Sequence, residues 1–368
     1  MSPLSDVSLA GTDVVPTTEI RTPGGSVRRS NPLEEAGWDA NLKPCPAATF
    51  FHGSAWARVL HDTYGYAPVY FTRNVSGRLQ SLLPIMEVDS WLTGRRGISL
   101  PFTDDCEPLC SDAASFRDLF REAMEYGEAR DWKYLECRGG KPLFPDAPVS
   151  TAFHGHRLRL TADEDALFAG VESAVRRAIR KAEKSGVRVE VSHDRDAVRA
   201  FYGLHCRTRR KHGQPPQPFR FFQNVHDHVL SQNQGFVVLA RYRQTSVAAA
   251  IFFHFGKKAI YKFGASDQTF QHLRANDLVM WEAIRWYAQN GFEQLDFGRT
   301  SLANEGLRRF KLGWGTEEQR IEYVRYDRRT GGFVTANDES SGWHTRVFQV
   351  LPGFCGRLAG AVLYKHMA

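Results

Sequence analysis

The chain has 368 residues, of which 42% are hydrophobic and 12% aromatic, a length and composition that allow two globular domains. Its net charge of +7 mildly favours anionic partners, although many soluble proteins are equally basic. The sequence has no apolar run of about 18 residues and carries an acid early in its N-terminus, so we expect neither a membrane-spanning helix nor a signal peptide.

In the first half, residues 1–45 are rich in Pro, Gly, Ser and Thr with little periodicity, which predicts a mobile tail. Apolar periodicity predicts a helix within 48–66, and two apolar runs around a Ser-Gly turn at 76–77 predict a hairpin. A helix is predicted over 115–131, followed directly by a strand. The prolines that follow indicate a domain boundary near residue 150.

The second half repeats this order. Residues 163–185 predict one or two helices that end at Gly186, a residue suited to a helix C-terminus. The elements predicted after Gly186 are a strand, a helix, three strands of an antiparallel meander, a helix and two strands, at 187–192, 196–213, 235–243, 248–256, 259–266, 276–291, 292–297 and 321–326.

An internal repeat supports two copies of one unit. The segment EAMEYGEARDWKYLECR at 122–138 aligns without gaps on EAIRWYAQNGFEQLDFG at 282–298, with Leu135 on Leu295 and Glu136 on Asp296. The alternative is that any amphipathic helix followed by a strand gives such a match. We predict a tail, two domains and an amphipathic helical C-terminal tail, at 1–45, 46–150, 151–336 and 337–368.

Hairpin strands, a helix packed on them and a further strand are the order of a GNAT-type acyltransferase core. Over roughly residues 48–330, the chain resembles the Fem family and the neighbouring CelD-like group of acetyltransferases. The segments that carry the resemblance are FFHGSAWARVL, GISLPFTD, VRRAIRKAEKSGVRVEV and LDFGRTSLANEGLRRFKLGWGTE. It implies an α/β (α+β) fold of two tandem GNAT-like domains, each a mixed, mostly antiparallel sheet flanked by helices.

The resemblance also implies an acyltransferase. Fem members add amino acids from aminoacyl-tRNA to peptidoglycan precursors, and CelD-like proteins accompany bacterial polysaccharide genes. We therefore expect transfer of an acyl or aminoacyl group onto an amine, or a hydroxyl, of a cell-envelope or exopolysaccharide precursor. The alternative is a non-catalytic RNA-binding or polysaccharide-assembly module on the same fold.

Two departures leave the donor open between acyl-CoA and aminoacyl-tRNA. The glycines with which acetyl-CoA enzymes approach a diphosphate are absent from QHLRAN at 271–276. The long helical arm of some tRNA-using members is absent as well. Basic and aromatic residues at 207–222 would suit RNA, although cations there also complement a helix C-terminus.

Candidate phosphate-binding residues are cations at 177–180, at 274 and at 299–311. Arg177 and Arg180 lie on a basic helical stripe whose guanidinium groups suit diphosphate oxygens, or else form a solvated face. The full set of candidate substrate-binding residues is Trp56, Arg177, Arg180, Arg274, Arg299, Arg308 and Lys311.

Candidate catalytic residues are Asp296, Tyr261 and Lys311. Asp296 ends a predicted strand and would take the proton of the attacking amine, or else caps the next loop; Asp267 and Glu305 are the other candidates for this base. Tyr261 would hold the acceptor or give a proton to the leaving group, or else packs in the core. Lys311 belongs to a basic cluster that we expect to face a phosphate, or else forms a solvated helix end. No Ser-His-Asp order or Cys-His pair is evident, which favours direct transfer.

The six cysteines form no CxxC pair or disulfide-like spacing, which predicts reduced thiols in a cytoplasmic protein. The segment TDDCEPLCSD at 103–112 lacks a histidine and zinc-like spacing, so we expect no metal. The partners that we expect are a phosphate-bearing substrate and, as a candidate, tRNA. The C-terminal tail either contacts the inner membrane at its surface or covers the protein's own core.

Overall fold

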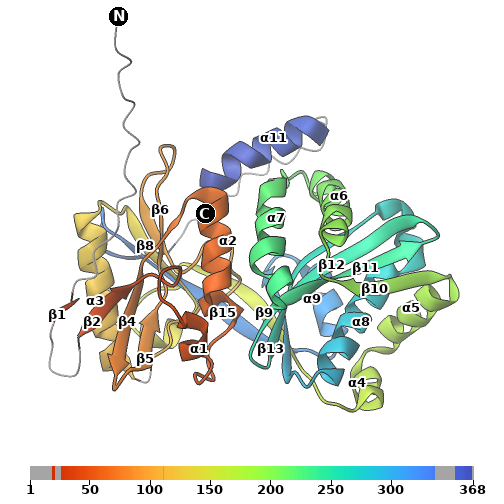
Figure 1. Ribbon diagram of the computed structural model, residues 1–368, viewed down its shortest axis with the longest axis horizontal. Coiled ribbons are helices and arrows are strands. Elements are labelled where there is room, and N and C mark those ends of the chain that lie inside the picture. Colours follow the sequence, from red (N-terminus) through yellow and green to blue (C-terminus); the bar gives the residue numbers. More distant parts are fainter. Residues whose placement is uncertain (1–18, 21–25, 111, 336–352, 367–368) are drawn as a thin grey trace, which may run out of the picture.

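The computed structural model describes residues 19–20, 26–110, 112–335 and 353–366 (Figure 1). The first half contains, in chain order, β1 (Glu19–Ile20), β2 (Val27–Ser30), α1 (Trp38–Leu42), α2 (Ser54–Tyr64), β3 (Ala67–Pro68), β4 (Tyr70–Val75), β5 (Arg78–Leu83), β6 (Met86–Val88), β7 (Arg96–Ile98), α3 (Ala113–Ala129) and β8 (Tyr134–Arg138).

The second half begins with a strand and ends in the C-terminal helix. Its elements are β9 (Thr151–Arg159), α4 (Glu164–Gly170), α5 (Ser173–Lys184), β10 (Val187–Ser192), α6 (Arg195–Lys211), α7 (Phe219–His228), β11 (Gly235–Tyr242), β12 (Thr245–Phe255), β13 (Lys258–Ser266), α8 (Ala275–Gln289), β14 (Gln294–Ser301), α9 (Glu305–Leu312), β15 (Glu317–Asp327), β16 (Gly332–Val334) and α11 (Gly353–Leu363). Short 3-10 helices include η1 (Phe50–His52), η4 (Gln268–Leu273) and η5 (Tyr364–His366). No helix among the described residues is long and apolar enough to cross a membrane.

One large mixed sheet joins the two halves, and helices flank it (Figure 1). Its strand order is β10-β11-β12-β13-β14-β9-β15-β8-β7-β6-β3, and a smaller sheet has the order β1-β2-β4-β5. The halves meet where β15 pairs on one side with β9 and on the other with β8. The predicted tandem α/β architecture is confirmed, with the addition that the two units share a continuous sheet.

The predicted repeat is visible in the backbone. In the alignment, the last residue of α3 coincides with that of α8, and the first residue of β8 coincides with that of β14. Each of these strands also pairs in parallel with a strand that precedes its helix: Leu135 lies opposite Gly97, and Leu295 lies opposite Ala259. The aligned residues therefore occupy equivalent positions in two copies of one βαβ unit.

The predicted mobile tail is too long. Residues 26–45 are folded: β2 pairs with β4, and Trp38 and Leu42 are buried in the core. The Trp38 indole donates a hydrogen bond of 3.0 Å to the carbonyl of His52. A few apolar anchors thus order a stretch whose composition is mostly polar. Residues 1–18 and 21–25 lie outside the described residues.

The sequence predicts a C-terminal tail over 337–368, of which 337–352 and 367–368 lie outside the described residues. The remainder is α11 followed by η5, and its last turn is anchored: Tyr364 and His366 are buried. The Tyr364 hydroxyl donates to the carbonyl of Pro215 at 3.2 Å, and Ser90 Oγ lies 2.8 Å from His366 Nδ1. This end of the chain therefore packs on both halves of the protein.

Candidate active site

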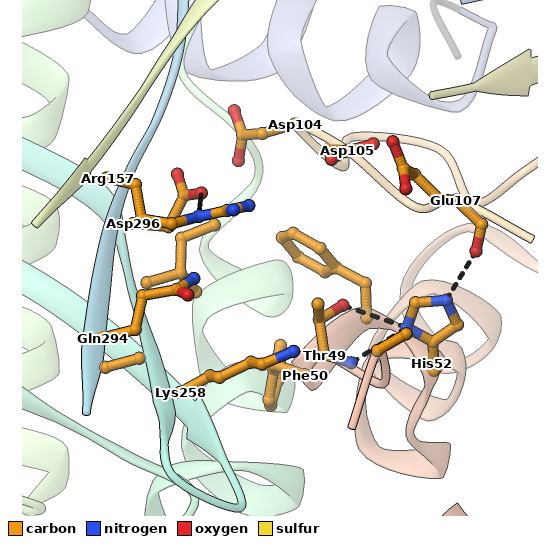
Figure 2. Close-up of a pocket in the computed structure, with 14 residues that line it drawn as sticks. Thr49, Phe50, His52, Asp104, Asp105, Glu107, Arg157, Lys258, Gln294 and Asp296 are labelled. Carbon is orange, nitrogen blue, oxygen red and sulfur yellow. Dashed lines mark hydrogen bonds and ion pairs between the residues drawn. The ribbon is translucent and has the colours of Figure 1, made fainter. Parts of the chain in front are cut away.

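A cavity of about 230 Å³ opens at the junction of the two halves (Figure 2). The first half contributes η1 and the loop 104–107, and the second half contributes the starts of β13 and β14 and one residue of β9. The polar side chains that line this junction pocket are Thr49, His52, Asp104, Asp105, Glu107, Arg157, Lys258, Gln294 and Asp296. Three of the carboxylates thus come from one loop and the fourth from β14.

Strand alternation explains which side chains reach the junction. On β14, Leu295 and Phe297 pack into the core of the second half, so Asp296 between them points the other way, into the pocket. On β13, Tyr261 packs toward that same core and Lys262 points to the junction. Parallel pairing of β13 with β14 ends at Ile260 and Asp296, so Asp296 lies where the strands part.

Asp104 is held by cations and hydrogen bonds at the back of this pocket. Its carboxylate lies 2.6 Å from the Lys262 ammonium, and its carbonyl accepts a 2.7 Å hydrogen bond from the Tyr323 hydroxyl. Burial alone would raise the pKa of Asp104, but Lys262, Arg299 and Lys311 together hold this pKa below its ordinary value. Asp104 is therefore an anion that orders the site.

Asp105 and Asp296 behave in the opposite way. Burial raises the pKa of Asp296, although Gly298 N–H donates a 2.7 Å hydrogen bond to its Oδ1 and Arg157 Nε lies 3.9 Å from its Oδ2. Burial and the nearby carboxylates raise the pKa of Asp105 well above its ordinary value. Among the described atoms, Asp105 Oδ1 is buried without a hydrogen-bond partner. Both carboxyl groups accept protons more readily than an exposed aspartate does.

Lys311 lies beside these acids and is 2% exposed. Its Nζ donates to the carbonyls of Gly298 at 2.7 Å and Arg299 at 3.1 Å. Burial lowers the pKa of Lys311 to about 8, against the opposing charges of Asp104 and Asp296. This placement corrects the expectation of a phosphate-facing lysine, because the ammonium is directed into the protein, toward carbonyls and carboxylates.

A second hollow, the α8 groove, lies on the other face of β13. One part, of about 270 Å³, is lined by Tyr261, Ala265, Asn276, Met280 and Phe310 among others. A smaller part, of about 160 Å³, shares Asn276 and Phe310 with the first part and extends to Arg274 and Asp277 at the start of α8. A surface hollow that shares Arg274 and Asp277 continues to Arg177 and Lys181 of α5. The structure therefore brings Arg177 and Arg274 together at one end of the groove and places Tyr261 at the other.

The basic end of the α8 groove fits a phosphate-bearing donor through its side chains more than through its backbone. Arg177, Lys181 and Arg274 supply positive charge next to a helix N-terminus, which suits phosphate oxygens. However, the N–H of Asp277 is already bonded to the carbonyl of Arg274 at 3.1 Å, and burial raises the pKa of the Asp277 carboxyl to about 6. The side chains fit a phosphate group, whereas the backbone offers little of the cradle that a glycine-rich loop would give.

The remaining predicted residues have local roles and are not among those that line the described hollows. Arg180 lies over the ring of Phe168 at 5.3 Å, and Arg299 packs on Phe153 at 4.4 Å. Arg308 forms an ion pair of 2.7 Å with Glu318. Trp56 is fully buried in the core, where its ring meets the rings of phenylalanines from both halves.

The sequence did not point to the partners of Asp296. Asp104, Asp105, Arg157, Lys258 and Lys262 had no assigned role, although the first two were noted in an acidic loop. No local signal marks them: in Ile260-Tyr261-Lys262-Phe263, a lysine between apolar residues is also the usual pattern of a strand with one exposed face, so its burial is not evident from the sequence. Among the described residues, no group of three His, Cys, Asp or Glu side chains is arranged to hold a metal ion.

Comparison with known proteins gives a consistent fold. Residues 170–312 match the family model of the acetyltransferase (GNAT) domain. FemX resembles 77% of this chain over 94% of its own length, with a TM-score of 0.63 at 14% identity. The L-PGS of Bacillus licheniformis resembles 87% of the chain over 97% of its own, with a TM-score of 0.51 at 12% identity.

A third solved structure is the C-terminal domain of a protein from Agrobacterium fabrum assigned as a lysylphosphatidylglycerol synthetase. It matches 73% of this chain over 86% of its own, with a TM-score of 0.51 at 16% identity. Likeness at these identities establishes a shared fold. None of the curated proteins matches the chain in sequence.

Proposed function

We propose, from the premise that residues 170–312 form a GNAT-type acyltransferase domain, that this chain transfers an acyl or aminoacyl group onto an amine of a cell-envelope or exopolysaccharide precursor. A hydroxyl is the alternative acceptor. One observation carries the proposal: Asp296 lies where β13 and β14 part, with the junction pocket on its own side and Tyr261 of the α8 groove on the neighbouring strand. An acceptor in the pocket and a donor in the groove would meet at this point.

Asp296 is proposed as the general base. The acceptor nitrogen forms a bond to the acyl carbon, the bond from that carbon to the donor sulfur or oxygen breaks, and Asp296 takes the proton of the amine directly or through water. Burial raises the pKa of the Asp296 carboxyl, so this carboxylate accepts a proton from the amine more readily than an exposed aspartate would. The acidic side chains of Asp104, Asp105 and Glu107, which line the pocket, would also attract an ammonium group into it (Figure 2).

Tyr261 is proposed as the group that protonates the leaving group. Burial raises the pKa of its phenol to about 12, so it stays protonated at neutral pH and is suited to protonate the strongly basic alkoxide that leaves an aminoacyl ester, whereas a thiolate would leave without this proton. Tyr261 lines the α8 groove, where the bond to the donor would break. We assign Lys311 a positioning role, because it donates hydrogen bonds to the carbonyls of Gly298 and Arg299, downstream of Asp296 in β14, and places a positive charge near the Asp296 carboxyl.

The donor is proposed to be acyl-CoA or aminoacyl-tRNA, bound with its phosphates near Arg177, Lys181 and Arg274. The names of the structural neighbours favour aminoacyl transfer, since one is assigned as a synthetase that joins a lysyl group to a phospholipid. Two cations of the 207–212 segment have intramolecular partners, with Arg207 paired to Asp267 and Arg209 bonded to Pro215 and Tyr364. We place the reaction in the cytoplasm, where both donors are made.

The test is to measure binding of radiolabelled aminoacyl-tRNA and of acyl-CoA to the purified protein, followed by transfer to amine acceptors. Retention of one donor, with transfer that Asp296→Asn abolishes while binding persists, supports the proposal and identifies the donor. Retention of tRNA without transfer to any acceptor favours the non-catalytic RNA-binding module. Binding of neither donor rejects the acyltransferase proposal for this chain.

A further inference from the structure

The apolar side chains most exposed in the described structure lie on two segments that are connected through His366. Six large hydrophobic residues are exposed, and the four most exposed are Trp91 at 85%, Leu358 at 67%, Val362 at 56% and Leu92 at 54%. Two of them lie on α11 and the other two in the turn between β6 and β7. The remaining pair, Val75 and Leu302, lie on other elements and are less exposed.

The contacts of His366 join these two elements. Its ring lies 5.5 Å from the ring of Trp91, its Nδ1 is 2.8 Å from Ser90 Oγ, and its carbonyl accepts a 3.1 Å hydrogen bond from Arg96. Leu358 and Val362 lie at four-residue spacing on one side of α11, and η5 with His366 follows this helix directly. Leu358 and Val362 of α11 are therefore connected through η5 to the His366 ring, which lies beside the ring of Trp91. We call Trp91, Leu92, Leu358 and Val362 the terminal patch.

The terminal patch has basic neighbours on the same helical segment. Arg357 and Lys365 are both exposed, and residues 353–366 contain no acidic residue. The solvent-facing side of this segment therefore alternates apolar and cationic side chains, where an ordinary surface helix would be polar. In Figure 1, α11 runs along the upper edge of the view, outside the sheets.

We propose that the terminal patch docks this protein on a membrane surface that carries anionic phospholipids. An exposed tryptophan beside leucine and valine suits the boundary between headgroups and acyl chains, where tryptophan is enriched. Arg357 and Lys365 would lie at the level of the phosphates and add electrostatic attraction. Two weak signals, apolar insertion and charge, together give reversible attachment. This inference is independent of the proposed reaction.

The experiment is co-sedimentation of the full-length protein with vesicles of phosphatidylcholine alone and of phosphatidylcholine with phosphatidylglycerol. We expect wild type to bind the mixed vesicles, and to bind them less as salt rises, because salt screens the cations. The variant Trp91→Ser/Leu358→Ser/Val362→Ser should lose about tenfold or more in partitioning, since three apolar groups leave the interface. The variant Arg357→Gln/Lys365→Gln should lose the preference for phosphatidylglycerol.

The matched control is Val75→Ser/Leu302→Ser, which removes exposed apolar side chains elsewhere and should bind vesicles as wild type does. Thermal melts of all variants establish that each is folded. Failure of wild type to bind the mixed vesicles overturns the proposal, and so does unchanged binding by the folded triple variant. Dimerisation of wild type in sedimentation velocity, lost in the triple variant, also overturns it, because the patch would then be a protein interface.

Discussion

The ammonium of Lys262 and the carboxylate of Asp104 lie 2.6 Å apart across the junction between the two halves of the chain. Their side chains are only 6% and 17% exposed, and Lys262 also lies over the rings of Phe51 and Trp56 at 5.1 and 5.8 Å. One charge pair thus links β13 of the second half to the acidic loop and to the aromatic core of the first half. This ion pair therefore borders the junction pocket and also holds the two halves together.

Removing one partner of this pair should destabilise the protein strongly. In Lys262→Met, the Asp104 carboxylate stays buried without its nearest cation, which typically costs about 3–5 kcal/mol in free energy of unfolding. Urea unfolding, monitored by circular dichroism, measures this change in the free energy of unfolding. Arg199→Gln breaks the exposed pair with Asp196, whose side chains are 64% and 87% exposed, and should cost less than about 1 kcal/mol. Equal losses in the two variants would contradict a structural role for the junction pair.

Asp296→Asn should abolish the proton transfer that we assign to this carboxyl. We expect kcat to fall by about 10²- to 10⁴-fold with a small change in KM, because the amide keeps the shape of the site but does not accept the proton. In wild type, the acid limb of the kcat profile should lie above the ordinary aspartate pKa of 3.8, since burial raises the pKa of Asp296. Steady-state kinetics against pH test both points. Glu293→Gln, which neutralises the exposed acid just before the same strand, should leave the profile intact.

Lys311→Met should shift the acid limb of the kcat profile along the pH axis rather than remove it. The positive charge of Lys311 lowers the pKa of Asp296, so its loss should shift the limb to higher pH. The same variant should also alter stability in alkali. Because the folded pKa of Lys311 is about 8 and its ordinary value is 10.5, the unfolded chain binds this proton more tightly. As the pH rises from about 8 to about 10.5, the free energy of unfolding should therefore increase more in wild type than in Lys311→Met. Superimposable kinetic and stability profiles would exclude both effects.

The basic end of the α8 groove should set the affinity for the donor. Arg177→Gln and Arg274→Gln each remove a cation from the hollow beside α8, and each should raise KM for the donor about tenfold, as expected for one charge-assisted hydrogen bond to phosphate. Arg180→Gln changes the same residue type one helical turn from Arg177, where the guanidinium stacks on Phe168, and should leave KM unchanged. Initial-rate kinetics with varied donor measure the three values. A similar rise in all three would point to general charge rather than to a site.

Trp56 was expected to contact substrate, and its position instead predicts an effect on stability. Its side chain is fully buried among aromatic rings of both halves, so Trp56→Ala should cost about 3–5 kcal/mol. The indole N–H of Trp56 is buried without a hydrogen-bond partner among the described atoms, so Trp56→Phe loses volume but no hydrogen bond. We expect the Phe variant to be clearly more stable than the Ala variant in thermal melts. A loss of activity in a fully stable Trp56→Ala protein would restore the original interpretation.

Much of the scaffold was accessible from sequence because its signals are local. The helix and strand of each repeat have their own periodicity, and Leu135 and Leu295 occupy equivalent positions in the pairing of their strands. Composition was a weaker guide, as residues 26–45 show: polar on average, they are folded because Trp38 and Leu42 reach the core.

The sequence by itself determined the two α/β units and singled out Asp296, although it predicted this residue at the end of a strand and the structure places it near the start of β14. Only the tertiary structure decided what surrounds that residue. Asp104, Lys262 and Lys311 are far apart in the chain, and whether each is solvated or buried depends on how the two halves close on one another. Hydrophobic periodicity records which face of an element is buried, but the energy of a buried charge depends on its partners, which no local pattern contains.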